Sequence, residues 1–179
     1  RFNMDGILLI NKEKNYTSRD VVNIISKELK TKKVGHTGTL DPFATGLLIL
    51  LIGNATKLAF LFEELDKKYD GEVVFGKLYD TDDVTGTVID EKYSNFDISK
   101  INGKMKEFIP SYMQLPPLYS AIKKNGLKAY QLARKGLDVE LVPRFVNIYQ
   151  FDSIEYNETL KFNSHVSKGT YIRSLARDL

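Results

Sequence analysis

The chain has 179 residues, 42% of them hydrophobic, and a formal net charge of +3 at pH 7. This length supports one substantial hydrophobic core, so a single domain is the expected organisation. No apolar run reaches the roughly 20 residues of a membrane-spanning helix. The absence of cysteine excludes disulfides and thiolate zinc sites, and it is typical of proteins in a reducing cytosol. The small excess of basic residues permits RNA binding without requiring it.

The first part of the chain predicts a strand, a helix and a second strand. Residues 7–10 form an apolar run of strand length. Thr17 or Ser18 is suited to cap a helix, and apolar residues recur at helical spacing until about Lys30. Residues 47–52 are continuously apolar, as in a buried strand. This order leaves a glycine-rich loop ahead of the second strand.

The middle of the chain predicts a second helix, a strand and a tight turn. The helix is expected to begin at Thr56 and to bury one face, and residues 73–75 are expected to form a strand. Three carboxylates lie within residues 80–87, just before Val88 and Ile89. Their spacing fits no calcium-binding loop, so turn chemistry is favoured over a cation site. The helix face expected in the core comprises Leu58, Ala59, Leu61, Phe62 and Leu65.

The second half predicts a helix, a hairpin, two strands and a closing helix. Residues 98–108 carry apolar side chains at helical spacing, whereas the prolines between 110 and 117 argue against regular structure there. Residues 119–130 predict a hairpin, because Asn125-Gly126 suits a two-residue turn. A short helix is expected after the hairpin. Strands are then expected over residues 145–154 and 160–166, and a closing helix near Thr170.

Basic side chains gather in two segments. The first, at the end of the first helix, is either a solvated helix end or a rim that faces phosphates, since positioning contacts to phosphate need only mobile positive charge. The second, in and after the hairpin, is interleaved with Tyr119 and Tyr130. It is either an exposed lysine-rich hairpin or an RNA contact. The first segment comprises Lys27, Lys30, Lys32 and Lys33, and the second Lys123, Lys124, Lys128, Arg134, Lys135 and Arg144.

A single carboxylate lies at the centre of the glycine-rich loop. Residues 35–48 are Gly-His-Thr-Gly-Thr-Leu-Asp-Pro-Phe-Ala-Thr-Gly-Leu-Leu. Glycines allow unusual backbone geometry, and Pro42 disfavours a helical conformation at Asp41. Asp41 is therefore expected on a stiff, irregular loop. A carboxylate displayed in this way suits catalysis, although aspartate more often serves as a turn residue that bonds its own backbone.

This loop resembles the signature loop of the TruB family of tRNA pseudouridine synthases, in which the matching aspartate is catalytic. Residues 79–86 resemble a further family loop, with Tyr79 in place of its first threonine. Three other blocks resemble the family in the same order, so the resemblance runs from Met4 to Leu179. The blocks are residues 4–12 (Met-Asp-Gly-Ile-Leu-Leu-Ile-Asn-Lys), residues 116–123 (Pro-Pro-Leu-Tyr-Ser-Ala-Ile-Lys) with Gly126, Tyr130, Ala133, Arg134 and Gly136, and residues 167–175 (Ser-Lys-Gly-Thr-Tyr-Ile-Arg-Ser-Leu).

The resemblance implies an α+β pseudouridine synthase fold, with a mixed, mostly antiparallel central sheet flanked by helices. It also implies that the basic hairpin and its helix form a flap on the T arm of tRNA, which favours the RNA-contact interpretation. The catalytic domain is expected to span residues 4–179 and to be truncated within its closing helix. Full-length members of the family complete the catalytic core and add a small RNA-binding domain, which is expected to be absent from this sequence. Residues 1–3 precede a plausible initiator, Met4, and are expected to lie outside the natural chain.

The resemblance assigns site residues as well. Asp41 is implied to be catalytic, with Arg173 as the partner that keeps it ionised and oriented. Tyr69 is implied to be a second catalytic residue, which stacks on the uracil and helps to remove the C5 proton, and Tyr171 is implied to lie in the same pocket. Without the resemblance, the tyrosines are ordinary packed aromatics and Arg173 belongs to a surface ion pair. The substrate-binding residues implied are His36, Tyr171, Lys12, Lys123 and Arg134.

The implied reaction converts the T-loop uridine of tRNA to pseudouridine. The base is flipped out, the glycosidic bond breaks and C5 is joined to the ribose, with the carboxylate either attacking carbon or stabilising a cationic sugar. The partner is the tRNA T arm. No cofactor, metal, membrane or obligate protein partner is expected, and the chain is expected to act as a cytoplasmic monomer. The alternatives are an RNA-folding helper whose chemistry is secondary and a synthase guided by a separate RNA.

Overall fold

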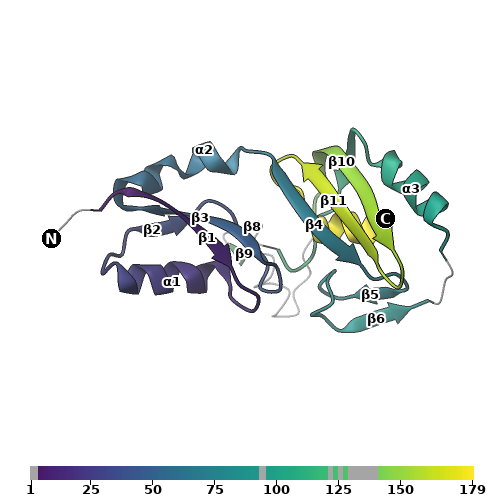
Figure 1. Ribbon diagram of the computed structural model, residues 1–179, viewed down its shortest axis with the longest axis horizontal. Helices are drawn as coiled ribbons and strands as arrows, with labels where there is room; N and C mark the ends of the chain where they lie inside the picture. The colour runs from purple at the N-terminus through teal and green to yellow at the C-terminus, as the bar shows by residue number, and fades with distance from the viewer. Residues whose placement is uncertain (1–3, 93–95, 121–122, 125–126, 129–140) are drawn as a thin grey trace. The chain divides into compact units, whose positions relative to one another are not determined.

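A computed structural model describes residues 4–92, 96–120, 123–124, 127–128 and 141–179 (Figure 1). Their contacts divide into two units, Arg1–Leu65 and Asp66–Leu179. Every strand pairing among the described residues is antiparallel, and helices accompany the sheets in both units. The α+β class is therefore confirmed. None of the helices in the described part of the chain is long and apolar enough to cross a membrane.

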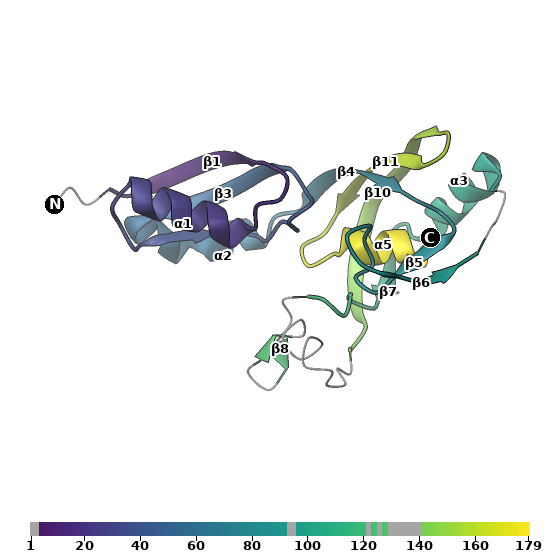
Figure 2. The same ribbon diagram turned by 90° about the horizontal axis from the view of Figure 1, so that it is seen from below.

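The first unit contains a three-stranded sheet, an 11-residue helix that shares its core, and two shorter helical segments. Strands β1 (Gly6–Lys12), β3 (Gly46–Ile52) and β2 (Val34–His36) lie in the order β1-β3-β2. Helix α1 (Ser18–Glu28) lies along the sheet (Figure 2). The core between them contains Val21 and Val22 from the helix and Leu48 and Leu50 from β3.

Helix α1 begins where the sequence predicts. The Thr17 hydroxyl accepts a hydrogen bond from the Asp20 amide at 3.0 Å, and the Asp20 carboxylate accepts one from the Thr17 amide at 2.9 Å. This reciprocal capping box satisfies two amides that have no partner within the helix. The helix ends at Glu28, two residues before the predicted end, and Lys30 has a left-handed φ of 51°.

For the second helix, the predicted first residue and the predicted buried face are both wrong. A 3₁₀ helix, η1 (Gly53–Leu58), comes first, and the α-helix that follows, α2 (Ala59–Glu63), has no buried residue. Thr56 lies inside η1, where its hydroxyl donates to the Gly53 carbonyl at 2.7 Å. The chain turns at Gly53, which has a left-handed φ of 62°, and the Asp5 carboxylate accepts from the next amide, that of Asn54, at 2.7 Å.

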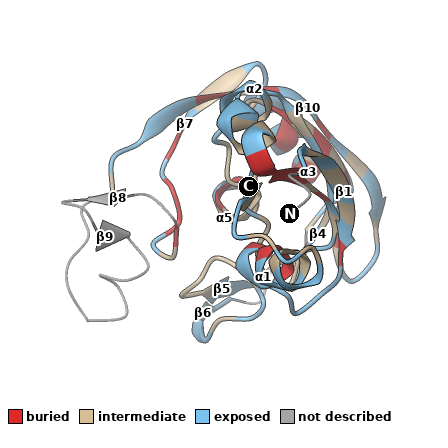
Figure 3. Cartoon of the chain, turned by 90° about the vertical axis from the view of Figure 1, so that its left-hand side faces the viewer, coloured by how far each residue is buried: buried red, intermediate tan, exposed pale blue. Residues whose placement is uncertain are grey.

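The second unit is a four-stranded sheet with two helices on its core side. Its strands, in spatial order, are β4 (Lys67–Val73), β11 (Leu160–Val166), β10 (Arg144–Tyr156) and β7 (Ser111–Gln114). Helices α3 (Ile98–Glu107) and α5 (Ile172–Asp178) contribute to the same buried cluster (Figure 3). The buried members of this core are Val73, Ile101, Met105, Val146, Ile148, Phe151, Leu160, Phe162, Val166 and Leu175.

Two strand predictions in this unit are wrong. The prolines were expected to exclude regular structure, yet β7 lies between Pro110 and Pro116 and pairs with β10. Proline is tolerated just outside an edge strand, and the four residues of β7 keep their amides. The strand expected at 73–75 lies earlier, as β4, because pairing with β11 extends back to Lys67.

The other elements of the second unit are confirmed in position. Helix α3 matches the predicted helix from residue 98, and β10, β11 and α5 match the last two strands and the closing helix. Strands β5 (Lys77–Tyr79) and β6 (Val88–Glu91) enclose the predicted turn. Strands β8 (Lys123–Lys124) and β9 (Leu127–Lys128) pair as the predicted hairpin does. The turn of that hairpin and the short helix after it lie outside the described residues.

We predict that replacing Gly71 with alanine destabilises the second unit. Gly71 pairs with Phe162, and a Cβ added at Gly71 would lie 2.4 Å from the Phe162 ring. Because that ring is only 2% exposed, it has little room to move. Overpacking of this kind costs about 1–3 kcal/mol. Urea unfolding followed by circular dichroism measures the change.

The matched control is Gly103→Ala in α3. Nothing lies within 4 Å of a Cβ at Gly103. The alanine is therefore expected to raise the free energy of unfolding by up to about 1 kcal/mol, through helix propensity. Equal effects of the two substitutions would contradict the packing argument.

Candidate active site

The loop that carries Asp41 is fastened on both sides of that residue. Ser18, in the first turn of α1, has a hydroxyl that accepts from the Leu40 amide at 3.0 Å and donates to the Leu40 carbonyl at 3.3 Å. After Asp41, the Pro42 carbonyl accepts from the Asn15 amide at 2.8 Å. Asp41 itself is partly exposed between these two anchors. The backbone around the carboxylate is thus held on both sides of a partly exposed residue.

A buried lysine supports the same loop. Lys12, at the end of β1, is 1% exposed. Its ammonium donates to the carbonyls of Tyr16 at 2.7 Å, Glu13 at 2.9 Å and Pro42 at 3.3 Å. Burial lowers the pKa of Lys12, whereas the negative charge of Asp41 acts to raise it. These contacts give Lys12 a part in holding the loop, and direct binding of substrate by Lys12 stays a prediction.

His36 lies at the start of the same loop. It is the last residue of β2 and pairs with Leu50 in the central strand of the sheet. Its side chain is partly exposed. The first unit therefore holds Lys12, His36 and Asp41 on one sheet and the loop between two of its strands. The role of His36 in positioning RNA stays a prediction.

Arg173, in the first turn of α5, is held by the second unit. Its Nη1 donates to the Thr81 carbonyl at 2.8 Å and its Nη2 to the Tyr119 carbonyl at 3.1 Å. Its Nε lies 3.9 Å from Oδ2 of Asp83, and both side chains are about 10% exposed. Backbone carbonyls thus set the plane of the guanidinium, and a carboxylate balances part of its charge.

The aspartates of the loop between β5 and β6 stabilise a turn, and one of them also contacts Arg173. The turn interpretation is confirmed, because Asp80 Oδ1 accepts from the Thr87 amide at 2.8 Å and Asp83 Oδ1 from the Thr85 amide at 2.9 Å. The contact of Asp83 with Arg173 is a role that sequence reasoning missed. The available signal was the resemblance of residues 79–86 to a family loop. Among the described residues, no group of three or more metal-ligating side chains has the geometry of a metal site.

The two predicted pocket tyrosines lie on different elements of the second unit. Tyr69, on β4, pairs with Ser164 and is partly buried against the core. Tyr171 is the N-cap residue of α5 and is also partly exposed. Its amide donates to Oε1 of Gln114 at 2.7 Å, and its carbonyl accepts from Nε2 of Gln114 at 3.1 Å. Stacking of either ring on a base stays a prediction.

The remaining site predictions fall in or beside the hairpin. Lys123 lies in β8, paired with Lys128. Arg134 lies outside the described residues. The substrate-binding roles of Lys123 and Arg134 stay predictions. The proximity of Asp41 to Arg173, which belong to different units, also stays a prediction.

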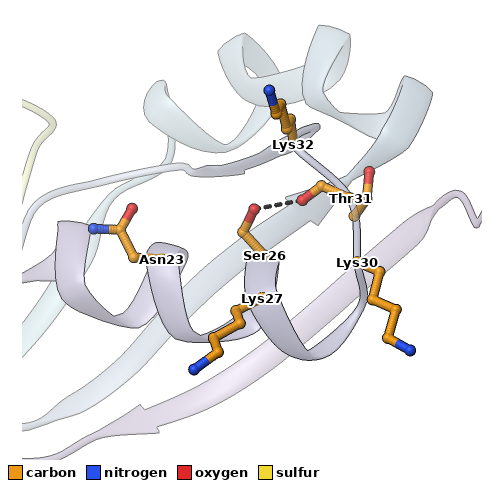
Figure 4. A pocket seen from close by; sticks show the side chains of 6 residues that line it. All are labelled: Asn23, Ser26, Lys27, Lys30, Thr31 and Lys32. Carbon is orange, nitrogen blue, oxygen red and sulfur yellow. Dashed lines mark hydrogen bonds between the residues drawn. The ribbon is translucent and has the colours of Figure 1, made fainter.

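A basic hollow lies at the end of α1. It has a volume of about 350 Å³ and no acidic residue in its lining. Figure 4 shows three lysines around it, with their ammonium groups pointing in different directions. The Ser26 hydroxyl donates to the Thr31 carbonyl across its base. The lining comprises Asn23, Ser26, Lys27, Lys30, Thr31 and Lys32.

Comparison with known proteins assigns the family. Residues 26–172 match the family model described as TruB family pseudouridylate synthase (N terminal domain). The chain belongs to the TruB family. TruB relatives include the tRNA pseudouridine synthase B of Acholeplasma laidlawii, 57% identical over 98% of this chain, and that of onion yellows phytoplasma, 50% identical over 98%. The chain spans 63% of the length of each of these relatives.

Solved structures agree with the TruB assignment at the level of fold. A Cbf5-Nop10-Gar1 complex contains a chain that matches 96% of this one with a TM-score of 0.71 and 28% sequence identity. The match covers 42% of that chain. A structure of an H/ACA RNP bound to a substrate RNA matches 96% of this chain with a TM-score of 0.66 and 26% identity, over 40% of that chain.

We predict that Ser18→Ala loosens the loop that carries Asp41. The Ser18 hydroxyl is almost fully buried, so its loss leaves two backbone groups of Leu40 without their partner. An unsatisfied buried group costs about 1–3 kcal/mol. Amide hydrogen exchange at Leu40 should therefore accelerate by roughly tenfold or more.

Ser26→Ala is the matched control for this measurement. Ser26 lies in the same helix, and its hydroxyl bonds the Thr31 carbonyl instead. Exchange in residues 37–45 should then equal that of the wild type. Unchanged exchange at Leu40 in Ser18→Ala would contradict the proposed anchoring.

Proposed function

We propose that this chain forms the catalytic part of a tRNA pseudouridine synthase that isomerises uridine-55 of the T loop. The observation that carries the proposal is a partly exposed carboxylate, Asp41, on a loop fastened by Ser18, Asn15 and Lys12. Relatives that share half or more of its residues are named tRNA pseudouridine synthase B. The activity is proposed rather than assigned because the chain spans 63% of those relatives.

In the proposed reaction, Asp41 acts on the ribose carbon of the target uridine. It either attacks C1′ or stabilises a cationic sugar, and both routes need an ionised carboxylate in a defined position. Uracil leaves as a stabilised anion, so a second carboxylate is not required. The base then turns and C5 bonds to C1′, which breaks the bond between C1′ and the carboxylate where one has formed. C5 then loses its proton and N1 gains one, so the product is neutral. A loop held on both sides reduces the reorganisation that this step needs.

Arg173 is proposed to pair with Asp41 during the reaction. Its guanidinium is already oriented by the carbonyls of Thr81 and Tyr119 and by Asp83. An arginine held in this way presents a fixed charge to a second carboxylate. We propose that the Arg173 guanidinium orients the catalytic carboxylate.

The target uridine lies within a folded RNA loop and must leave its stack to react. We propose that Tyr69 and Tyr171 stack on the flipped base and that His36 positions the RNA around it. A base–aromatic stack is worth about 1–3 kcal/mol, comparable to the few kcal/mol that flipping costs. Lys123 and Arg134 are proposed to contact the T arm. The enzyme is proposed to act as a cytoplasmic monomer without an obligate protein partner.

A guided form of the enzyme is the less favoured alternative. The matched solved structures are a Cbf5-Nop10-Gar1 complex and an H/ACA RNP with substrate RNA, at 28% and 26% identity. The stand-alone proposal is supported by the higher identity, 57%, to a protein named tRNA pseudouridine synthase B. Turnover of an unmodified tRNA transcript by the purified protein would exclude dependence on a guide RNA.

We predict that Asp41→Asn abolishes isomerisation while tRNA binding persists. The amide keeps the shape of the side chain but lacks the negative charge and the nucleophilic oxygen. The rate of tritium release from C5-labelled tRNA should fall at least about a thousandfold, as for other removed nucleophiles. Filter binding should show less than about a threefold change in Kd, since one dipole replaces one charge at a single contact. A normal rate in Asp41→Asn would overturn the assignment.

We also predict that the hollow at the end of α1 contacts phosphate. Replacing Lys27, Lys30 and Lys32 with alanine should reduce the slope of log Kd against log salt by roughly two to three. The rate at saturating tRNA should not change, because these contacts position the RNA. The control replaces the exposed Lys100, Lys104 and Lys106 on α3, which removes the same charge from another element. Equal slopes for both variants would contradict a specific role of the hollow.

A further inference from the structure

Gln114 is a fully buried polar residue at the end of β7. Its exposed fraction is 0%. The side-chain amide brackets one residue, because Oε1 accepts from the Tyr171 amide at 2.7 Å and Nε2 donates to the Tyr171 carbonyl at 3.1 Å. Nε2 also donates to the Tyr112 hydroxyl at 2.5 Å. Both N–H groups and the carbonyl of the amide are thus engaged, which satisfies a group that would otherwise be costly to bury.

The bracketed residue lies at a sensitive point of the chain. Tyr171 is the N-cap of α5, and its own side chain makes no capping hydrogen bond. Gln114 satisfies its amide from 57 residues away in the sequence. Arg173 follows two residues later, in the first turn of the helix. The position of the Tyr171 backbone therefore determines where the side chains of Tyr171 and Arg173 leave the main chain.

A hydrogen-bonded chain extends from Gln114 to the loop that holds Arg173. The Tyr112 hydroxyl donates to Oδ2 of Asp178 at 3.3 Å, and Oδ1 of Asp178 accepts from Nε of Arg177 at 2.9 Å. Nη1 of Arg177 then donates to Asp82 at 2.6 Å, in the β5–β6 loop. Burial raises the pKa of Tyr112, so the hydroxyl keeps its proton and can both accept and donate.

Packing alone does not account for this residue. A methionine of similar volume would fill the same space without a polar group to satisfy. The side-chain amide instead supplies a donor and an acceptor at a spacing that matches the carbonyl and the amide of a single residue, Tyr171. Two hydrogen bonds from one side chain restrain the orientation of the Tyr171 backbone as well as its distance from Gln114.

We propose that Gln114 is a positioning residue for the reaction, which holds Tyr171 and the start of α5 in the geometry that the flipped uridine requires. The inference rests on the proposed function, because the roles of Tyr171 and Arg173 toward the substrate are part of that proposal. It adds a residue that neither touches the substrate nor lies near Asp41 in the sequence. Gln114 should affect the rate of isomerisation more than the affinity for tRNA.

Gln114→Glu supplies a test within a single folded protein. An ionised glutamate accepts hydrogen bonds only, so it keeps the bond from the Tyr171 amide and loses both donor contacts. A protonated glutamate regains one donor, and burial raises the pKa of a carboxyl group. The single-turnover rate relative to wild type should therefore be low at pH 8 and recover at least tenfold by pH 5.5. The Kd for tRNA should change less than threefold at either pH.

Two further variants complete the experiment. Gln114→Met should lower the single-turnover rate at every pH and accelerate hydrogen exchange at the Tyr171 amide. Gln150→Glu, the control, changes an exposed glutamine on β10 and should show the wild-type pH profile. Thermal unfolding of each variant checks that the fold is retained.

Three outcomes would decide against the inference: a rate ratio of Gln114→Glu that is flat with pH, a wild-type rate in Gln114→Met, or equal losses of rate and affinity. If the wild-type protein released no tritium, the proposed function would fail instead. In that case, unchanged exchange at Tyr171 in Gln114→Met would overturn the bracket as well, and accelerated exchange would support it.

Discussion

The proposed active site depends on the attachment of the Asp41 loop to α1 and β1. A loop between two strands is ordinarily among the more mobile parts of a protein. Here the Ser18 hydroxyl serves both backbone groups of Leu40, and the Lys12 ammonium and the Asn15 amide share the Pro42 carbonyl. The capping box that starts α1 also sets the position of Ser18. The contacts that cap the start of α1 therefore also position the residue that holds the Asp41 loop.

Both units use backbone carbonyls to hold a cation. In the first, three carbonyls surround the Lys12 ammonium, and in the second, two carbonyls orient the Arg173 guanidinium. Carbonyls are held by the fold, so they hold a long side chain in place more firmly than a mobile side-chain partner would. A cation held in this way keeps its direction, so little reorganisation is needed at the moment of reaction. The Asp83 carboxylate, 3.9 Å from Nε of Arg173, balances part of the positive charge of the guanidinium.

The elements that sequence predicted well are those whose signals are local. The capping residues Thr17 and Ser18 indicated the start of α1, and apolar runs indicated β1 and β3. The errors came from contacts between distant residues. Where the second helix was expected, η1 and a short α2 occur instead, and the Asn54 amide in η1 bonds Asp5, 49 residues away. Strand β7 exists because β10, some thirty residues later, pairs with it.

The candidate site divides in the same way. The motif around Asp41 was recognisable in the sequence, whereas composition alone favoured a turn role. The residues that hold the site were not recognisable, because Ser18, Asp83 and Gln114 act through partners 22 to 90 residues away. A buried glutamine or a loop aspartate has no local pattern that distinguishes it from an ordinary one. Such supporting residues become visible only when the fold brings their partners together.

The most direct test of the central claim is an experimental structure of the protein bound to a T-arm RNA hairpin. We expect the target uridine to lie outside its stack, with an oxygen of Asp41 within about 3.5 Å of its C1′ atom. We also expect the backbone of residues 37–45 to keep the contacts with Ser18 and Lys12. A stacked uridine with C1′ far from Asp41, or a loop released from these contacts, would contradict the account.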